Sequence, residues 1–234
     1  MEAPVRGSMV LAGILLKLGG YGLLKVVYSF SFFPSGIVDL ILSINFWGLL
    51  GVSLICLCSR DIKVLIAYSS IVHMGIMVVG VLSGSVVGAA GAGLMILAHG
   101  FSSPGLFSAA NFNYEVVGSR HLSFSKGVGL LYPIRGLIWF ILLASNIAAP
   151  PSIRLVREIM ICIRGLKLGV YLSVVLGGAT FLSAAYNLYL YSVQQGDVGL
   201  GILPGGHMTS SFVLSSFLHF FPAYLCTLGV FTLL

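Results

Sequence analysis

Residues 7–24 read GSMVLAGILLKLGGYGLL, a stretch of eighteen residues in which Lys17 is the single charged side chain. The apolar character continues on both sides, over residues 5–31. A helix of about 20 predominantly apolar residues is long enough to cross the hydrocarbon core of a membrane. This stretch therefore predicts a membrane-spanning helix with a lysine in its middle.

The composition extends this prediction to the whole chain. Hydrophobic residues make up 58% of the 234 residues and charged residues 8%, with a mean hydropathy of +1.08. A soluble protein carries about 25% charged residues, so this chain lacks the charge to cover a surface in water. Ordinary globular enzymes and disordered, coiled-coil and collagen-like proteins are excluded for the same reason. We predict an all-α polytopic membrane protein with a single transmembrane domain over residues 1–234.

Apolar segments follow one another with short polar breaks between them. No strand alternation typical of a membrane β-barrel is present, which leaves α-helices as the spanning structure. The seven predicted transmembrane segments are 5–31, 37–58, 62–83, 89–113, 128–163, 168–193 and 210–234.

The fifth segment, 128–163, is too long for one straight span and contains Pro150 and Pro151. Two adjacent prolines remove two backbone donors and clash with the preceding turn, so we predict a helix broken at this point. Interrupted helices at membrane depth mark ion sites in transporters, although a packed proline kink explains the pattern equally well.

The net charge of +6 comes from 12 basic and 6 acidic residues that form no basic run or stripe. This distribution does not point to a nucleic-acid partner. Basic residues instead gather at the second and fourth loops, which by the positive-inside rule face the matrix or cytoplasm. They are Arg60, Lys63, Arg120, Lys126 and the nearby Arg135. The spacing of the four cysteines (56, 58, 162 and 226) is not that of a structural zinc site or redox pair, so we interpret them as plain buried thiols.

Lys17 lies 11 residues after Arg6, roughly 16 Å along a helix and close to the membrane midplane. Insertion of a lysine there costs about 2.5–3.5 kcal/mol, so Lys17 needs a function or a buried partner. A structural pairing with a carboxylate is the alternative, and we favour a function.

His73 and His99 lie at similar depth in the third and fourth segments. A single membrane histidine is usually a satisfied hydrogen-bonding residue, but two beside a midplane lysine favour a proton relay, because histidine titrates near neutral pH. Glu158 is a carboxylate inside the fifth segment, and it is either part of the same proton path or simply paired with Arg154 and Arg157. Lys63, at the start of the third segment, is best explained as an interfacial anchor, and its position also suits proton uptake.

Four long stretches resemble the subunit-four family of NADH–ubiquinone oxidoreductase, respiratory complex I, of animal mitochondria. They are EAPVRGSMVLAGILLKLGGYGLLKV (2–26), SLICLCSRDIKVLIAYSSIVHMG (53–75), LMILAHGFSSPGLFSAANFNYE (94–115) and LLASNIAAPPSIRLVREIMI (142–161). Their order and spacing agree with the family over nearly the whole chain. The resemblance implies an antiporter-like fold of 14 helices, of which this chain is similar to the last seven.

The resemblance also implies roles for individual residues. Lys17 matches the central lysine of the family, and His73 and His99 match its relay histidines. Glu158 falls where the family has an exit-side glutamate on a broken helix, although Arg157 stands where the family usually has glycine. The half that carries the family's other glutamate and lysine is missing, so we expect a fragment, a truncated gene model or a piece of a split protein.

By this resemblance the chain is a core membrane-arm subunit of complex I in the mitochondrial inner membrane, and it moves protons as NADH reduces ubiquinone elsewhere. We expect it to bind no metal, nicotinamide, flavin, iron–sulfur cluster or quinone itself, although the complex uses NADH, flavin, iron–sulfur clusters and ubiquinone. Its expected partners are neighbouring antiporter-like subunits and membrane lipids, not nucleic acid. The alternatives are a subunit of a sodium/proton antiporter and a non-conducting structural fragment.

Overall fold

The computed structural model describes residues 4–30, 34–150, 152–196 and 210–233, and the side chains of residues 153, 168, 210, 211 and 226–233 lie outside this description. Pro151 and the side chain of Cys226, both named above, lie outside this description. In chain order the helical elements are α1 (Val5–Val10), the π-helical turn η1 (Leu11–Leu15), α2 (Leu16–Ser29), α3 (Ser35–Cys58), α4 (Ile62–Leu82), α5 (Val86–Val117), the 3₁₀ turn η2 (Leu122–Ser125), α6 (Val128–Leu131), α7 (Pro133–Ile147), α8 (Ile153–Leu168), α9 (Val170–Gln195) and α10 (Ser210–Leu233).

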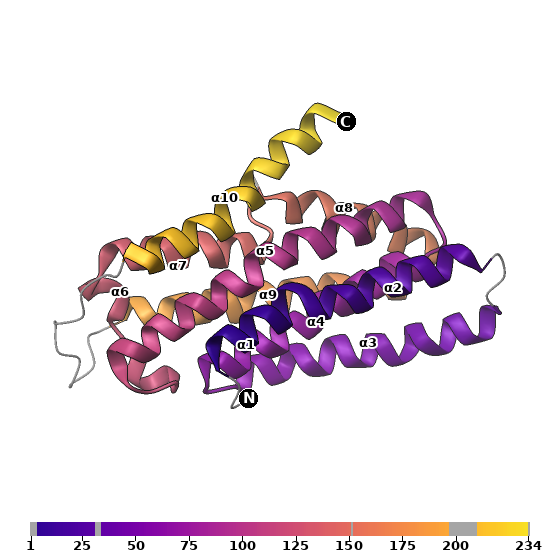
Figure 1. Ribbon diagram of the computed structural model, residues 1–234. Helices are drawn as coiled ribbons and strands as arrows, with labels where there is room; N and C mark the ends of the chain where they lie inside the picture. The colour runs from indigo at the N-terminus through magenta and orange to yellow at the C-terminus, as the bar shows by residue number, and fades with distance from the viewer. Residues whose placement is uncertain (1–3, 31–33, 151, 197–209, 234) are drawn as a thin grey trace.

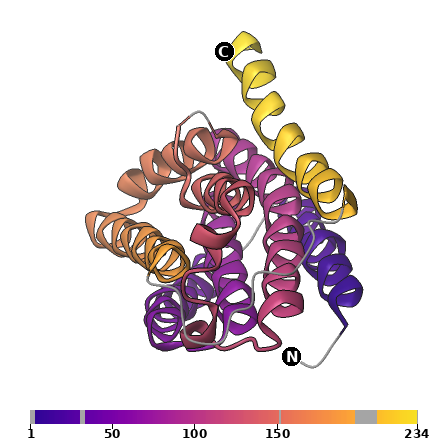
Figure 2. The ribbon, with the colours of Figure 1, turned by 90° about the vertical axis from the view of Figure 1, so that its left-hand side faces the viewer.

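The long helices run alongside one another as a bundle, with the C-terminal end of α10 extending away from it (Figures 1 and 2). By length and composition, five helical stretches of the described chain can cross a membrane: Val5–Ser29, α3, α4, α5 and α9. The pair formed by η2–α6 and α7 is bent by 116°, and it makes a sixth only when the two parts are counted together as one span. These confirm the helical membrane fold expected from the sequence. The segment predicted at 210–234 is also a helix, α10.

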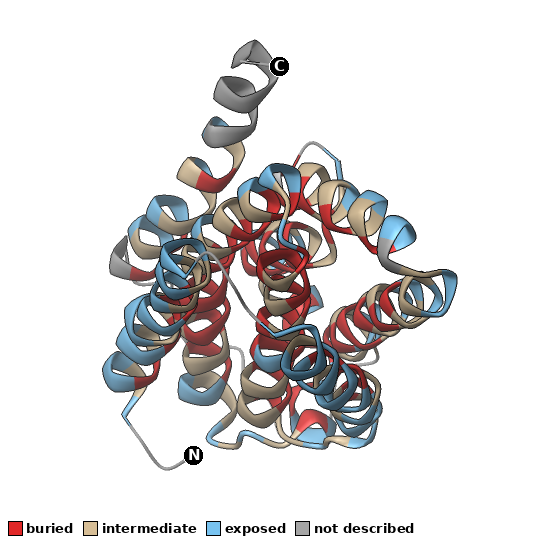
Figure 3. Ribbon diagram, turned by 90° about the vertical axis from the view of Figure 1, so that its right-hand side faces the viewer, coloured by how far each residue is buried: buried red, intermediate tan, exposed pale blue. Residues whose placement is uncertain are grey.

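Large apolar side chains cover the outside of this bundle. Trp47 is 81% exposed and Tyr171 is 90% exposed, while charged residues such as Lys17 and Arg154 are buried. Figure 3 shows the buried positions along the inward faces of the helices. A protein in water rarely exposes large apolar patches, so this surface is suited to lipid.

The second and fourth loops lie against each other at one end of the bundle. The backbone of Asp61 forms a β-bridge with that of His121. Ile62 N donates to Arg120 O at 3.1 Å, and Leu122 N donates to Arg60 O at 2.8 Å. The two basic loops are therefore on one side, as predicted. Arg135 does not belong with these loop residues, because it is buried within α7.

The predicted break near Pro150 is confirmed. α7 ends at Ile147, Ala148 adopts a left-handed conformation with φ of 66°, and α8 begins at Ile153. A left-handed conformation is uncommon for residues other than glycine. The fifth predicted segment is therefore divided among three helices, α6, α7 and α8, and the last of these packs against α5.

Two glycines of α5 provide a direct test of the packing of α8. A Cβ added to Gly91 would lie 3.0 Å from Ile161 Cγ1 and 3.3 Å from Met160 Cβ, whereas a Cβ on Gly93 would meet nothing within 4 Å. Gly91→Ala should therefore push α8 away and lower the free energy of unfolding by about 1–3 kcal/mol. Gly93→Ala should raise it by up to about 1 kcal/mol through helix propensity. Thermal unfolding midpoints of the two variants should move in opposite directions, and equal shifts would contradict this packing.

Candidate functional site

Arg154, at the start of α8, lies at the centre of a buried polar cluster. Its Nη1 atom is 3.2 Å from His73 Nε2 on α4 and donates to Asn146 O on α7 at 2.8 Å. Its Nη2 atom donates to Ser102 Oγ on α5 at 2.8 Å and also contacts His99 Nδ1. One guanidinium therefore joins α4, α5, α7 and α8 at a single point.

The contacts of Arg154 determine how the two histidines carry their protons. A guanidinium has donors and no acceptor, so His73 Nε2 and His99 Nδ1 must each accept a hydrogen bond. Each ring is then neutral, with its own proton on the opposite nitrogen. Those opposite atoms, His73 Nδ1 and His99 Nε2, are buried and have no hydrogen-bond partner among the described residues. The ring centroids are 5.3 Å apart, so the histidines form a close pair with unused N–H groups.

The break between α7 and α8 creates the acceptor that positions Arg154. In a continuous helix the carbonyl of Asn146 would accept from residue 150, but proline has no N–H group to donate. Arg154 Nη1 supplies the missing donor to Asn146 O and also contacts Asn146 Oδ1. The break therefore leaves the carbonyl of Asn146 free, and the buried guanidinium of Arg154 donates to it.

The side-chain amide of Asn146 is held in place from the other side by α9. Asn146 Nδ2 donates to Asn187 Oδ1 at 3.0 Å, and Asn187 Nδ2 donates to Ser183 O at 2.7 Å. Because its amide group is fixed in this way, Asn146 presents its oxygen to Arg154.

Lys17 is buried on α2, next to an irregular turn. In the π-helical turn η1 the N–H of Leu16 bonds to Leu11 O, five residues back. The carbonyl of Ala12, its usual partner in an α-helix, is thereby released. Lys17 Nζ donates to Ala12 O and, at 3.3 Å, to Ser103 Oγ on α5. No carboxylate pairs with Lys17 among the described residues, which argues against the structural alternative considered above.

Small residues allow α5 to approach Lys17 closely. A Cβ on Gly100 would lie 3.6 Å from Gly13 O and 3.9 Å from Lys17 Cε. A mostly apolar groove of about 560 Å³ runs beside Lys17 between the first helix, α5 and α10, with His219 at its edge.

Two adjacent serines on α5 bind Lys17 and the arginine cluster, respectively. Ser103 accepts from Lys17, while Ser102 accepts from Arg154. His99 lies three and four residues earlier, which is one turn away on the same side of the helix. Lys17 and the two histidines therefore belong to two neighbouring groups of hydrogen bonds on α5, which together form one buried polar region.

Glu158 is not part of this region. Its Oε1 atom forms an ion pair with Arg157 Nη2 at 3.2 Å, and its side chain is 14% exposed. Within the described chain no hydrogen bond joins Glu158 to Lys17 or to either histidine. The sequence analysis left open a pairing with both arginines, and the structure shows the pair with Arg157 while Arg154 faces the histidines.

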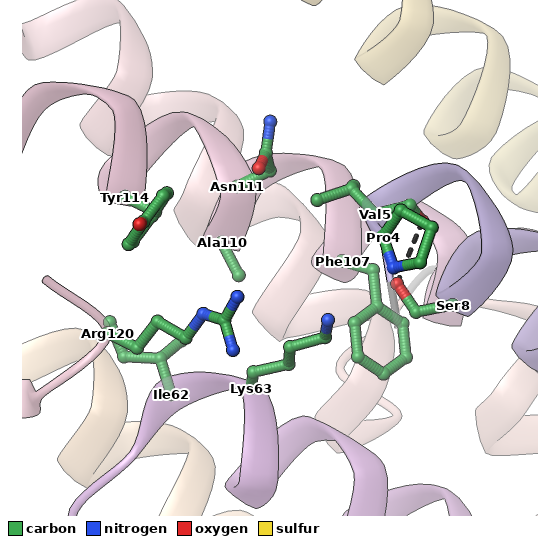
Figure 4. A pocket seen from close by; sticks show the side chains of 10 residues that line it. All are labelled: Pro4, Val5, Ser8, Ile62, Lys63, Phe107, Ala110, Asn111, Tyr114 and Arg120. Atoms are coloured by element: carbon green, nitrogen blue, oxygen red, sulfur yellow. Dashed lines mark hydrogen bonds between the residues drawn. The ribbon is translucent and has the colours of Figure 1, made fainter. Parts of the chain in front are cut away.

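Lys63 lies in a separate pocket at the end of the bundle where the second and fourth loops meet. The pocket has a volume of about 150 Å³, and Arg120, Tyr114 and Ser8 also line it. Figure 4 shows the side chains of Lys63 and Arg120 directed toward the same space. Lys63 precedes His73 by ten residues on α4, about 15 Å along the helix, so it is not in contact with the buried cluster.

The sequence analysis considered Arg154 only as a partner for Glu158 and did not place it at the centre of a buried cluster. The available signal was its position three residues after Pro151, in the first turn of the helix that follows the break. No group of three metal-binding side chains (His, Cys, Asp or Glu) occurs in the part of the chain that the structure describes.

Comparison with known proteins shows that the chain as a whole is similar to subunits of a respiratory complex. NADH-ubiquinone oxidoreductase chain 4 of Lumbricus terrestris is 47% identical over 192 residues, which cover 82% of this chain and 42% of the relative. The same subunit of Ceratitis capitata is 42% identical over 231 residues, covering 97% of this chain and 51% of the relative. The chain thus spans about half the length of the curated relatives it matches.

Two solved structures share the fold. A chain of respiratory complex I from Thermus thermophilus superposes with a TM-score of 0.70 at 24% identity, covering 81% of this chain and 42% of its own. A chain of the archaeal membrane-bound sulfane sulfur reductase superposes with a TM-score of 0.83 at 20% identity, and the match covers 96% of this chain and 47% of the reductase chain. The family described as NADH:quinone oxidoreductase/Mrp antiporter, TM, matches residues 1–183. From the buried lysine, the broken helix and these matches, we conclude that the chain belongs to the NADH:quinone oxidoreductase/Mrp antiporter family.

Proposed function

We propose that this chain forms a proton-conducting half of a core membrane-arm subunit of respiratory complex I. In this proposal it moves protons across the mitochondrial inner membrane while other subunits transfer electrons from NADH to ubiquinone. It acts beside other antiporter-like subunits and holds no nicotinamide, flavin, iron–sulfur cluster or metal of its own. The similarity to chain 4 of several animals supports the proposal.

The observation that carries the proposal is the environment of Lys17. Its side chain is 7% exposed in a helix that crosses the membrane by length and composition, and no carboxylate pairs with it in the described chain. An ionisable group inside a membrane is expensive to bury and is typically functional. Ser103, which accepts a hydrogen bond from Lys17, lies one helical turn after His99 on α5, so Lys17 is held close to the histidine pair.

In this mechanism Lys17 holds the proton, and the histidines pass it on. Arg154 already bonds to the facing nitrogen of each ring, so a proton can add there only by displacing Arg154. A proton that reaches either ring also lies beside a permanent positive charge, so it moves on rather than resting there. We assign proton uptake to Lys63 and release to Glu158, as the family resemblance suggests.

The proposed function is tested by vesicles that contain the purified complex in sodium-free buffer. Addition of NADH should drive proton uptake without sodium, because no step of the proposed path uses that ion. Proton uptake that requires sodium and continues without NADH would instead support a sodium/proton antiporter, which the family description also covers.

Glu158→Gln should lower NADH-driven proton uptake at least about tenfold, because glutamine cannot release a proton. The matched variant Arg157→Met removes the ion-pair partner of Glu158 and leaves the carboxylate in place. It should retain uptake within about threefold if Glu158 acts by proton release. If both single variants lost proton uptake equally and the double variant recovered it, Glu158 would serve only to neutralise Arg157.

A further inference from the structure

A second buried cation, Arg135 on α7, lies in an environment unlike that of Arg154. Its side chain is 4% exposed, and two aromatic rings lie against the guanidinium. The central carbon is 3.2 Å from the centre of the Phe112 ring and 4.0 Å from that of Tyr132. Cation–π contacts satisfy the faces of a guanidinium and leave its N–H groups to bond in the plane.

The N–H groups of Arg135 have no acceptor in the part of the chain that the structure describes. Nε, Nη1 and Nη2 are all buried, and none has a hydrogen-bond partner there. Arg135 also forms no ion pair with any described residue. The carboxylate of Glu115, which is exposed, accepts from Asn111 Nδ2 at 2.7 Å. A buried charge without a partner is costly, so this arrangement requires a compensating acceptor.

Three further buried donors surround the same small cavity. They are Asn113 Nδ2 on α5, Trp139 Nε1 on α7 and Gln194 Nε2 on α9, and none has a partner among the described residues. All three side chains are at most 5% exposed, and all three line one cavity with Arg135. Unpaired buried donors are rare in native proteins. The side chains of these four residues, which come from three helices, line a common space, and together they leave six buried nitrogens without an acceptor among the described residues.

The size of this cavity restricts what can occupy it. About 10 Å³ is accessible to the centre of a water-sized sphere, which is room for about one water-sized species. A water molecule accepts at most two hydrogen bonds, which is fewer than the unpaired donors around the cavity. A phosphate group needs more room, whereas a single-atom anion such as a halide accepts from several donors at once and neutralises the guanidinium.

We propose that the cavity formed by Asn113, Arg135, Trp139 and Gln194 is a binding site for a compact monovalent anion of the size of chloride. The bound anion joins α5, α7 and α9 and compensates the charge of Arg135. Since α7 also carries Asn146, the anion stabilises the helix that ends at the arginine cluster. The site does not use Lys17 or the histidines, so it is independent of the proposed function.

The test measures halide binding by the purified membrane complex that contains this chain. In gluconate buffer at constant ionic strength, radioactive chloride should bind with one ion fewer per chain in Arg135→Met than in the wild-type protein. Chloride should also raise the thermal unfolding midpoint of the wild type more than that of this variant. Lys126→Met removes an exposed basic residue near the same end of the bundle and should behave like the wild type.

Trp139→Phe keeps the aromatic packing and removes one donor. It allows the proposal to be tested even if Arg135→Met does not fold. It should weaken chloride binding about tenfold. Unchanged chloride binding in both Arg135→Met and Trp139→Phe would overturn the proposal. The proposal would also be overturned if removal of lipid abolished the stabilisation by chloride and anionic lipid without chloride restored the stability. That result would mean that the donors bind a lipid headgroup.

Discussion

Arg154→Met is expected to lower the free energy of unfolding by about 2–3 kcal/mol and to stop proton transport. The change leaves five acceptor atoms without their donor: His73 Nε2, His99 Nδ1, Ser102 Oγ and both oxygens of Asn146. Each unsatisfied buried group costs about 1–3 kcal/mol, and removal of a buried charge returns part of the total. Thermal unfolding and NADH-driven proton uptake of the complex measure the two effects.

Two further variants separate the role of Arg154 from that of a general positive charge on α8. Arg154→Lys keeps the charge but cannot reach the histidines and Asn146 together, because an ammonium lacks the planar fork of a guanidinium. It should therefore fail in transport as well. Arg164→Met removes an arginine of the same helix whose Nη2 makes one long hydrogen bond of 3.4 Å to Ser83 O. If Arg154→Met changes the free energy of unfolding and proton transport no more than Arg164→Met does, the cluster does not depend on Arg154.

Lys17→Met should reduce proton transport by about 100-fold or more while the protein still inserts and assembles. Methionine has nearly the same length and no proton to carry, and loss of a buried charge does not impair insertion into lipid. Lys17→Arg should be equally inactive, because a guanidinium remains protonated under all ordinary conditions. Proton uptake and the amount of assembled complex should be measured on the same membranes.

The control for Lys17 lies on the same helix. Lys25 is exposed and contacts the ring of Tyr21 at 5.7 Å. Lys25→Met removes the same charge from the same helix and should leave transport within about twofold. Normal transport in Lys17→Met, or an equal loss in Lys25→Met, would contradict the assignment of Lys17.

Much of the fold could be predicted from the sequence because the protein is surrounded by lipid, which requires long apolar helices. Apolar length defines spanning helices directly, and the missing N–H of Pro150 marks the point where α7 must end. Lys17, His73 and His99 stood out because an ionisable residue in an apolar segment is rare. Those predictions depend on local sequence, and the structure places all three residues in one buried region.

Features that depend on contacts between distant residues could not be predicted. The partners of Arg154 come from positions 73, 99, 102 and 146, and no local pattern shows that these helices meet. The π-helical turn before Lys17 has no sequence signal, since Leu11–Leu15 is an ordinary apolar run. Arg135 was assigned to the basic loops because it follows them in sequence, yet its helix turns inward and buries it.

A double-mutant cycle on proton transport tests most directly whether Lys17 and the histidine cluster form one path. His99→Asn keeps an acceptor oxygen for Arg154 near the position of Nδ1 but cannot take up a proton, so it should reduce transport without disturbing the cluster. If the proton passes through both residues, the variant that combines Lys17→Met and His99→Asn should transport no less than Lys17→Met alone. Losses that multiply in the double variant would mean that the two residues act independently, and the single path would be contradicted.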